Sequence, residues 1–199
     1  MGAYQAKSAA SYLASLVNLA NPGTNDLAEV GGGSVNWGAG TGWSGFAALA
    51  RCLDTGIVPT LNQTWSVLVQ YTGAGNASTN IIGLLDSVGH NGRFIILDRV
   101  GDVRVFNGSG AAVSTNAPAS PAAANYGFAG LQPYRNAAAE GAMIVAGVGA
   151  TDLSIYIGAR NTNGLLTVPF DGAVESIALY SVTLTAPQVL ARETAQAAL

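Results

Sequence analysis

The sequence predicts an all-β fold, a two-sheet antiparallel sandwich that ends in a short C-terminal helix. Apolar and other residues alternate along 154–160 and 173–180, as they do on half-buried strands. Glycine contributes 26 of 199 residues and charged residues only 10%, a balance typical of β-rich folds with many tight turns. Thr185-Ala186-Pro187-Gln188 has the form of a capping box and predicts a helix that continues to about Ala198.

The two closing strands are separated by turn-forming residues. Asn161-Thr162-Asn163-Gly164 ends the first strand, because Asn and Gly adopt positive φ at the lowest cost. Along the second strand, alternation places one set of side chains, Val174, Ser176, Ala178 and Tyr180, opposite Glu175, Ile177 and Leu179. We expect one of these faces to pack on the core and the other to be partly covered.

The middle of the chain has the pattern of a β-meander. Short apolar strands are predicted at 79–85, 93–98 and 103–108, with turn residues between them at the regular spacing of all-β sandwiches. Residues 109–125 are small, poor in charge and interrupted by two prolines, which predicts a long loop.

The closing segment resembles a known family. Its motifs Y-I-G-A-R-N, F-D-G-x-V-x-S-I-A-L-Y and L-T-A-x-Q-V are similar to the last strands of laminin-G-like domains of the concanavalin A-like jelly-roll family. The run Gln63–Tyr71 looks like the family's early T-W-S-V strand, and residues 46–59 look like the strand before it. The resemblance implies a jelly roll but no single function, since the family includes lectins, adhesion modules, glycosidases and structural domains.

Length and composition favour one main domain. We expect an N-terminal arm and first strand over residues 1–24 and a single jelly-roll domain over residues 25–199. The composition of residues 8–20 is compatible with a helix, but its apolar residues settle no period, and we expect an extended arm.

Charge and hydropathy argue against two kinds of partner. Eight Lys and Arg are spread along the chain with no basic cluster, which disfavours nucleic-acid binding. No apolar run approaches a membrane span, and the first residues lack the pattern of a secretory signal peptide. A surface so poor in charge predicts that part of it is covered by other protein subunits of a larger assembly, with a homo-oligomer as one form of it.

The sequence contains little that predicts a catalytic site, and we expect that the protein is not an enzyme. A glycosidase needs two carboxyl groups about 5 to 9 Å apart, and no pair of acids has a spacing that predicts this. Asp98 and Asp102 flank a predicted turn, where Asp is favoured for turn formation alone. One His and one Cys disfavour zinc, and Cys52 lies in an apolar run that predicts a small core residue.

The sequence is compatible with two further hypotheses, a sugar site and a calcium site. Sugar binding would use aromatic faces together with Asn and Arg side chains in loops, and the candidates are Trp37, Trp43, His90, Asn91, Arg93, Tyr134, Arg135 and Asn136. For the two tryptophans, packing is favoured over ligand contact, and Trp65 is assigned to the core. Calcium takes oxygen ligands from loops, and the candidate ligands are Asp86, Asn91, Asn161 and Asn163, with ordinary turn roles as the favoured alternative.

Two classes of function are therefore compatible with the sequence, and an enzyme is favoured less than either. The segments Tyr4–Ala10 and Asn18–Thr24, followed by Gly42-Trp43, resemble small laminin-G-like virion proteins of tailed phages. This resemblance implies a structural or adhesion module on a virion surface, as a capsid decoration or tail-associated protein that is extracellular after lysis and binds surface glycans through rim loops. The alternative is a free carbohydrate-binding lectin module, and a glycoside hydrolase is the remote one.

Overall fold

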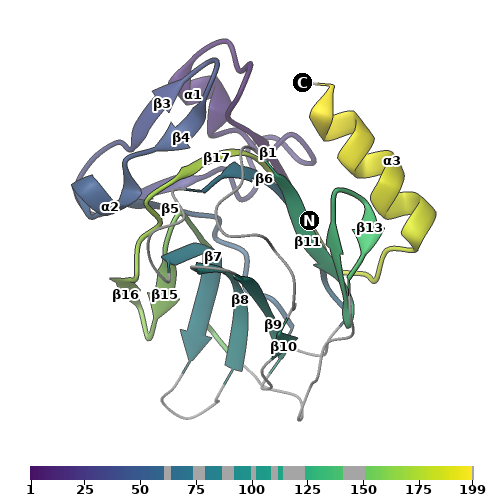
Figure 1. The fold of residues 1–199 in the computed structure, drawn as a ribbon. Coiled ribbons are helices and arrows are strands. Elements are labelled where there is room, and N and C mark those ends of the chain that lie inside the picture. Colours follow the sequence, from purple (N-terminus) through teal and green to yellow (C-terminus); the bar gives the residue numbers. More distant parts are fainter. Residues whose placement is uncertain are drawn as a thin grey trace.

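The computed structural model is a sandwich of two antiparallel sheets with a short C-terminal helix, which confirms the predicted jelly-roll fold class. The structure describes residues 1–60, 64–73, 79–86, 92–99, 102–108, 112–113, 124–140 and 151–198. Figure 1 shows the two sheets as layers, with helix α3 beside the strands of one of them.

One sheet, called sheet A here, has the strand order β13-β12-β11-β6-β17-β4-β3, and β1 also pairs with β17. Its strands are β1 (Gly2–Gln5), β3 (Asn36–Gly38), β4 (Gly42–Ser44), β6 (Ser66–Thr72), β11 (Ala124–Ala129), β12 (Gln132–Arg135), β13 (Ala138–Ala139) and β17 (Ala173–Tyr180). Strand β17 has the bounds predicted from its alternation.

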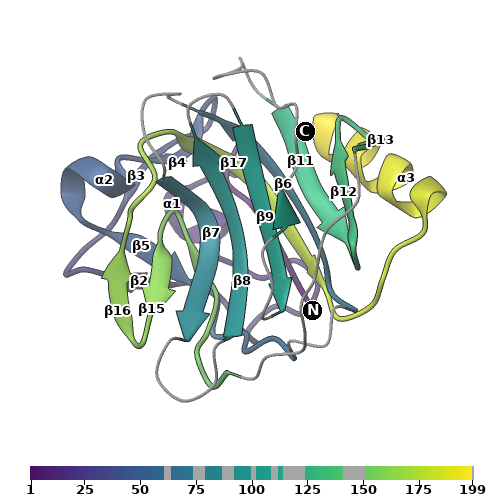
Figure 2. The same ribbon diagram turned by 60° about the horizontal axis from the view of Figure 1, so that its bottom comes forward.

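The other sheet, sheet B, has the order β10-β9-β8-β7-β14-β5-β2, and the β15–β16 hairpin joins it through a parallel pairing of β15 with β7. Its strands are β2 (Ala28–Val30), β5 (Cys52–Asp54), β7 (Thr79–Asp86), β8 (Gly92–Arg99), β9 (Asp102–Gly108), β10 (Ala112–Val113), β14 (Tyr156–Ile157), β15 (Arg160–Thr162) and β16 (Leu165–Thr167). The predicted meander is visible in Figure 2 as β7, β8 and β9 side by side. The predicted loop at 109–125 lies largely outside the described residues.

Three helices complete the fold: α1 (Tyr12–Ser15), α2 (Phe46–Leu49) and α3 (Ala186–Ala197). The first helix is one turn, capped by the Ser11 hydroxyl, which accepts from the Ala14 N–H at 3.1 Å. It replaces part of the extended arm expected over residues 8–20. Helix α3 follows Thr185 as predicted, and the Gln188 side-chain oxygen accepts from the Thr185 N–H at 2.8 Å.

The strand expected across residues 46–59 is wrong for its first half. Residues 46–49 form α2 instead, between Gly45 and Ala50, which both have positive φ. The helical turn buries the whole Phe46 side chain and leaves Ala47 and Ala48 exposed, which an alternating strand would not do. Strand pairing begins only at Cys52, which is buried as predicted.

The core lies between the sheets and is built from rows of inward-facing side chains. Strand register across sheet A places Tyr126, Val69, Ile177 and Tyr4 in one such row, and all four are buried. Trp65 is buried beside Phe94, as the sequence predicts. Buried aromatic side chains such as these are a major source of stability in sandwich folds.

A β-bulge in β17 changes the predicted faces. The register to β6 shifts between Val174 and Ser176, so Glu175 is the extra residue. As a result Val174 points into the same core as Ile177 and Leu179, while Ser176, Ala178 and Tyr180 point outward. Simple alternation had grouped Val174 with Ser176, Ala178 and Tyr180 on one face.

The predicted strand 154–160 is divided into β14 and β15 by Gly158. This residue has φ +78°, and a Cβ there would lie 2.1 Å from the Phe46 ring, so the position requires glycine. The chain then continues through Thr162, and the turn is Asn163-Gly164, both at positive φ. This is the two-residue Asn-Gly turn favoured in hairpins, two residues later than the predicted break.

Candidate functional site

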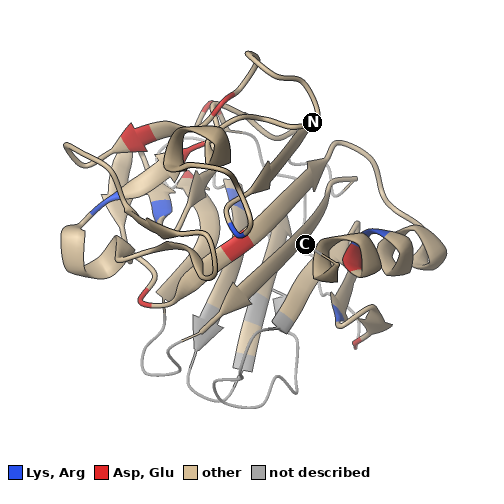
Figure 3. Ribbon diagram, turned by 90° about the horizontal axis from the view of Figure 1, so that it is seen from above, with Lys and Arg blue, Asp and Glu red and all other residues tan. Residues whose placement is uncertain are grey.

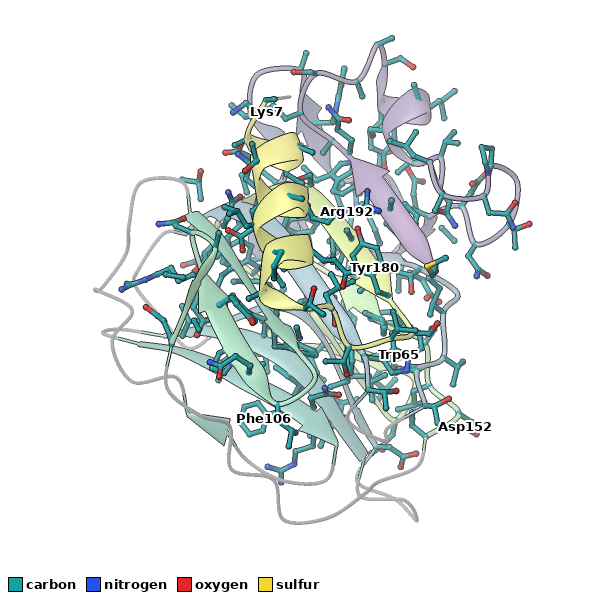
Figure 4. The ribbon with its side chains drawn as sticks, turned by 90° about the vertical axis from the view of Figure 1, so that its right-hand side faces the viewer. Lys7, Trp65, Phe106, Asp152, Tyr180 and Arg192 are labelled. Atoms are coloured by element: carbon teal, nitrogen blue, oxygen red, sulfur yellow. The ribbon has the colours of Figure 1, made fainter. Side chains whose placement is uncertain are left out.

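A groove lies on the outer face of sheet A, between helix α3 and the N-terminal segment. It consists of two adjoining cavities of about 220 and 300 Å³. We call it the helix groove, and its lining is Met1, Gly2, Ala3, Tyr4, Gln5, Leu19, Ala20, Ser176, Ile177, Ala178, Leu179, Tyr180, Arg192, Ala195 and Gln196. Figure 4 shows Tyr180 and Arg192 between α3 and β1.

Small side chains form the floor of the helix groove. The register places Leu68, Ala178 and Ala3 in one outward-facing row and Gln70, Ser176 and Gln5 in the next. Because Ala3 and Ala178 are short, the sheet leaves space between α3 and the residues around Leu19. The floor therefore combines an apolar strip with a polar one.

Tyr180 and Arg192 form one wall of the helix groove. The Arg192 guanidinium carbon lies 5.7 Å from the centre of the Tyr180 ring, a cation–π contact between strand β17 and helix α3. Burial raises the pKa of the Tyr180 hydroxyl, and the positive charge of Arg192 offsets part of that rise. The hydroxyl is therefore protonated at neutral pH and can donate a hydrogen bond.

Gln196 contributes a polar atom without a partner. Its side-chain oxygen is buried and has no hydrogen-bond partner among the described residues. A buried acceptor in this state costs free energy until a donor reaches it. Gln196 also lines the helix groove, so its amide would have to turn toward the groove for the oxygen to accept from a bound hydroxyl.

Helix α3 is held on sheet A by few buried side chains, Val189 and Glu193. Val189 packs with Leu68, Ala129, Tyr134 and Leu184. Glu193 is 3% exposed, and its carboxylate has no hydrogen-bond partner that meets normal geometry within the described part of the chain. Burial raises the pKa of Glu193 to about 7, although the backbone of Ala137 partly counteracts this.

The two predicted tryptophans do not reach the helix groove. Trp43 is fully buried, and its indole N–H donates to the Ser15 hydroxyl at 2.9 Å. Trp37 is half-buried against the main core and donates to the Ala6 carbonyl at 2.8 Å. Trp43 is thus excluded as a sugar ligand and takes the packing role favoured for it, because a side chain with no exposed surface cannot contact a ligand in the folded state.

The other described sugar candidates are divided between the two sheets. Tyr134 is buried under α3, Arg135 pairs with Glu140 at 2.7 Å, and Asn136 accepts from the Asn125 N–H at 3.1 Å. Arg93 lies on sheet B, with its guanidinium carbon 5.9 Å from the Phe106 ring centre. His90 and Asn91 lie outside the described residues.

The structure brings part of the predicted calcium set together. Strand β15 runs beside the end of β7, and the Asn163 N–H donates to the Leu85 carbonyl at 3.2 Å, next to Asp86. Asn161, however, uses its amide within the fold, donating to Ser154 and accepting from Gly164, both at 2.9 Å. Among the described residues no group of three or more acidic, His or Cys side chains is arranged to hold a metal. Calcium binding stays a prediction.

Neither the sequence-based sugar candidates nor the calcium candidates include the residues of the helix groove. In the sequence, Tyr180 is one residue of an alternating strand whose core-facing side is not assigned, and Arg192 falls within the expected terminal helix. The signal that could have identified them is the outward position of Tyr180 combined with a helix that docks over the same sheet. Register alone does not show which side of the helix stays open.

Comparison with known proteins gives a likeness of fold. No protein-family description and no curated protein matches the chain by sequence. Domain 4 of AbnA, a GH43 extracellular arabinanase from Geobacillus stearothermophilus solved with arabinotriose, matches 96% of this chain and 96% of its own at a TM-score of 0.56 and 12% identity.

A sialidase has a similar domain. The NanB sialidase from Streptococcus pneumoniae matches 82% of this chain at a TM-score of 0.54 and 12% identity, over 27% of its own length. This chain thus spans about a quarter of the NanB sialidase chains that it matches. At these identities the likeness shows the β-sandwich fold alone.

Proposed function

We propose that this chain is a non-catalytic carbohydrate-binding module with a concanavalin A-like jelly-roll fold, and that it binds a glycan in the helix groove. The observation that carries the proposal is the Tyr180 ring with the Arg192 guanidinium against it in the lining of one cavity, which also includes Gln196. Sugars present C–H faces to aromatic rings and hydroxyl groups to amides and guanidinium groups.

The dimensions of the helix groove suit a short oligosaccharide. Its two cavities, about 220 and 300 Å³, share Ala3, Leu19, Tyr180 and Arg192. Each is at or below the lower end of the volumes of small-molecule sites, which start at about 300 Å³. Two adjacent sugar units, one on each side of Tyr180, would use both.

The fold comparison supports this function. The arabinanase domain that matches over nearly all of both chains was solved with arabinotriose, so a sandwich of this size and shape can hold an oligosaccharide. The comparison does not carry the ligand's identity to this chain. The side chains of the helix groove carry the argument for a sugar.

Binding without hydrolysis is what the helix groove supports. Its described lining contains no Asp or Glu, whereas a glycosidase needs two carboxyl groups on either side of the scissile bond. The carboxylate of Glu193, on the same helix, lies among buried residues and does not line either cavity.

A glycan array with the isolated chain tests the proposal. We expect binding to at least one oligosaccharide and a loss of about tenfold or more in affinity in Tyr180→Leu and Arg192→Gln. Tyr12→Leu and Arg135→Gln are the matched controls, since neither residue lines the helix groove. Absence of binding to any glycan by the folded protein, or equal losses in the controls, would contradict the proposal.

A role on a larger particle is a second proposal, favoured by exposed apolar side chains near the N-terminus. Met1, Leu13 and Leu19 are 66%, 74% and 56% exposed. Charged residues are sparse along the described ribbon, as Figure 3 shows, and a surface poor in charge with exposed apolar side chains is typical of one that another subunit covers. Electron microscopy of the native source tests whether the chain decorates a phage virion. A chain found only as a free monomer would contradict this role.

A further inference from the structure

The outer face of sheet B carries two arginines that the groove on sheet A does not use. Arg93 on β8 pairs in register with Leu85 on β7, and Leu85 pairs with Thr162 on β15. These three residues therefore form one row across three strands. Arg160 lies two positions before Thr162, on the same face of β15. We call Arg93, Phe106, Arg160, Thr162 and Thr167 the arginine face.

Arg160 is held in place by two hydroxyl groups. Its Nε donates to the Thr162 hydroxyl at 3.0 Å and to the Thr167 hydroxyl at 3.3 Å. The two threonines also contact each other across the β15–β16 hairpin. These bonds use one edge of the guanidinium group and leave its terminal nitrogens for another acceptor.

Arg93 is oriented by an aromatic ring. Its guanidinium carbon lies over Phe106 at 5.9 Å from the ring centre, and the side chain is exposed. This cation–π contact restrains the guanidinium group and leaves its N–H groups free to bind. The two arginines are thus both restrained before any ligand binds.

No acidic side chain neutralises this pair within the described part of the chain. The ion pairs formed there join Lys7 with Glu175 and Arg135 with Glu140. Burial lowers the pKa of Arg160, and the charge of Arg93 lowers it further, which places the two cations within electrostatic reach of each other. Two like charges held together without a counter-charge favour binding of an anion.

We propose that the arginine face is a second binding site, for a carboxylate or sulfate group, with Arg93 and Arg160 as its two cationic donors. Planar guanidinium groups match the two oxygens of such anions. A free inorganic anion and an acidic sugar present the same chemistry, and the experiment separates them. The site is independent of the helix groove, and its failure would leave the proposed glycan binding on sheet A untouched.

The test titrates the full chain with sodium sulfate, sodium glucuronate and glucose at constant ionic strength, following the Arg160 Nε–H signal by NMR. We expect saturable shifts with sulfate and with glucuronate and none with glucose. Stronger binding of glucuronate would identify an acidic sugar as the ligand, and equal binding would identify the oxyanion alone.

Variants decide whether the pair is responsible. Arg93→Gln and Arg160→Gln should each weaken binding by about tenfold or more, as the loss of a charge-assisted hydrogen bond predicts. Arg135→Gln removes the same charge elsewhere and should leave the affinity within about twofold. Unsaturable shifts, or equal weakening by Arg135→Gln, would overturn the proposal. For variants whose Arg160 signal is absent, the thermal shift caused by sulfate gives the same comparison.

Discussion

The outer faces of the two sheets differ in the contacts that their side chains make. On sheet A, helix α3 covers an apolar row around Leu68 and leaves the helix groove beside it. On sheet B, the arginine face presents two cations restrained by threonines and an aromatic ring. The first face is held by packing and the second by polar contacts. Substitutions on sheet A should therefore change stability, and substitutions on sheet B should change the response to anions.

The largest effect is expected from Leu68→Ala. Leu68 is fully buried between sheet A and α3, and such truncations cost about 2–5 kcal/mol of unfolding free energy because they leave a cavity. Leu165→Ala is the control, since Leu165 is 69% exposed on the β15–β16 hairpin. Denaturant unfolding measures both. A Leu68→Ala cost no greater than that of the control would show that α3 does not pack on this face.

The next effect depends on pH and concerns Glu193. Its folded-state pKa, about 7, is above the ordinary value of 4.5. The free energy of unfolding of the wild type therefore keeps the full contribution of the neutral carboxyl below pH 4.5 and loses that contribution as pH rises through 7. Glu193→Gln stays neutral and should be more stable than wild type by up to about 3 kcal/mol above pH 7, with the difference vanishing below pH 4.5.

Unfolding curves at several pH values test this expectation. Glu140→Gln is the comparison variant, because the Glu140 carboxylate pairs with Arg135 at 2.7 Å instead of lying unpaired. The free energies of unfolding of Glu193→Gln and wild type should differ by an amount that depends on pH. A difference that stays constant between pH 4 and pH 8 would contradict the burial of the Glu193 carboxyl group beneath α3.

A smaller loss is expected when the start of α3 is altered. Thr185 and Gln188 form the capping box, and replacing a Thr cap by Ala costs about 1 kcal/mol. Thr194→Ala, near the end of the helix and exposed, should cost less. Thermal unfolding distinguishes the two, and an equal loss would show that the cap does not stabilise this helix in the protein.

The smallest effect is expected on sheet B. Arg93→Gln should change the free energy of unfolding by about 0.5 kcal/mol or less, because an exposed charge with no ion pair contributes little. At low salt the variant should be slightly more stable, since a like charge beside Arg160 is removed. A decrease of more than about 1 kcal/mol in the free energy of unfolding, measured with denaturant, would mean that Arg93 contributes to packing. The two outer faces would then not differ in the way proposed.

Local sequence rules predicted much of the fold. The bounds of β17, the start of α3 and the burial of Trp65 follow from alternation, a capping motif and an apolar strand. Two features did not follow from these rules. The bulge at Glu175 reverses the face of Val174, and Gly158 divides one predicted strand because Phe46 occupies the space beside it. Both depend on neighbours distant in sequence.

The candidate sites were harder to predict than the fold. The sequence identified Arg93 and, through the predicted meander, the strand of Phe106 beside it, but it could not show that Arg160 lies nearby, because the order of strands in sheet B decides this. Trp43 was a reasonable sugar candidate by residue type, yet its indole N–H bonds with Ser15 inside the core. Tyr180 and Arg192 meet only because α3 returns over the strand that precedes it.

The most direct test of the central claim is a titration that observes Tyr180 itself. The oligosaccharide bound best on the array is added to the full chain while the ring signals of Tyr180 are followed by NMR. Binding in the helix groove predicts saturable shifts of those signals, with a dissociation constant that rises about tenfold or more in Arg192→Gln. Saturable glycan binding that leaves the Tyr180 signals unchanged would place the sugar elsewhere and contradict the helix groove as the binding site.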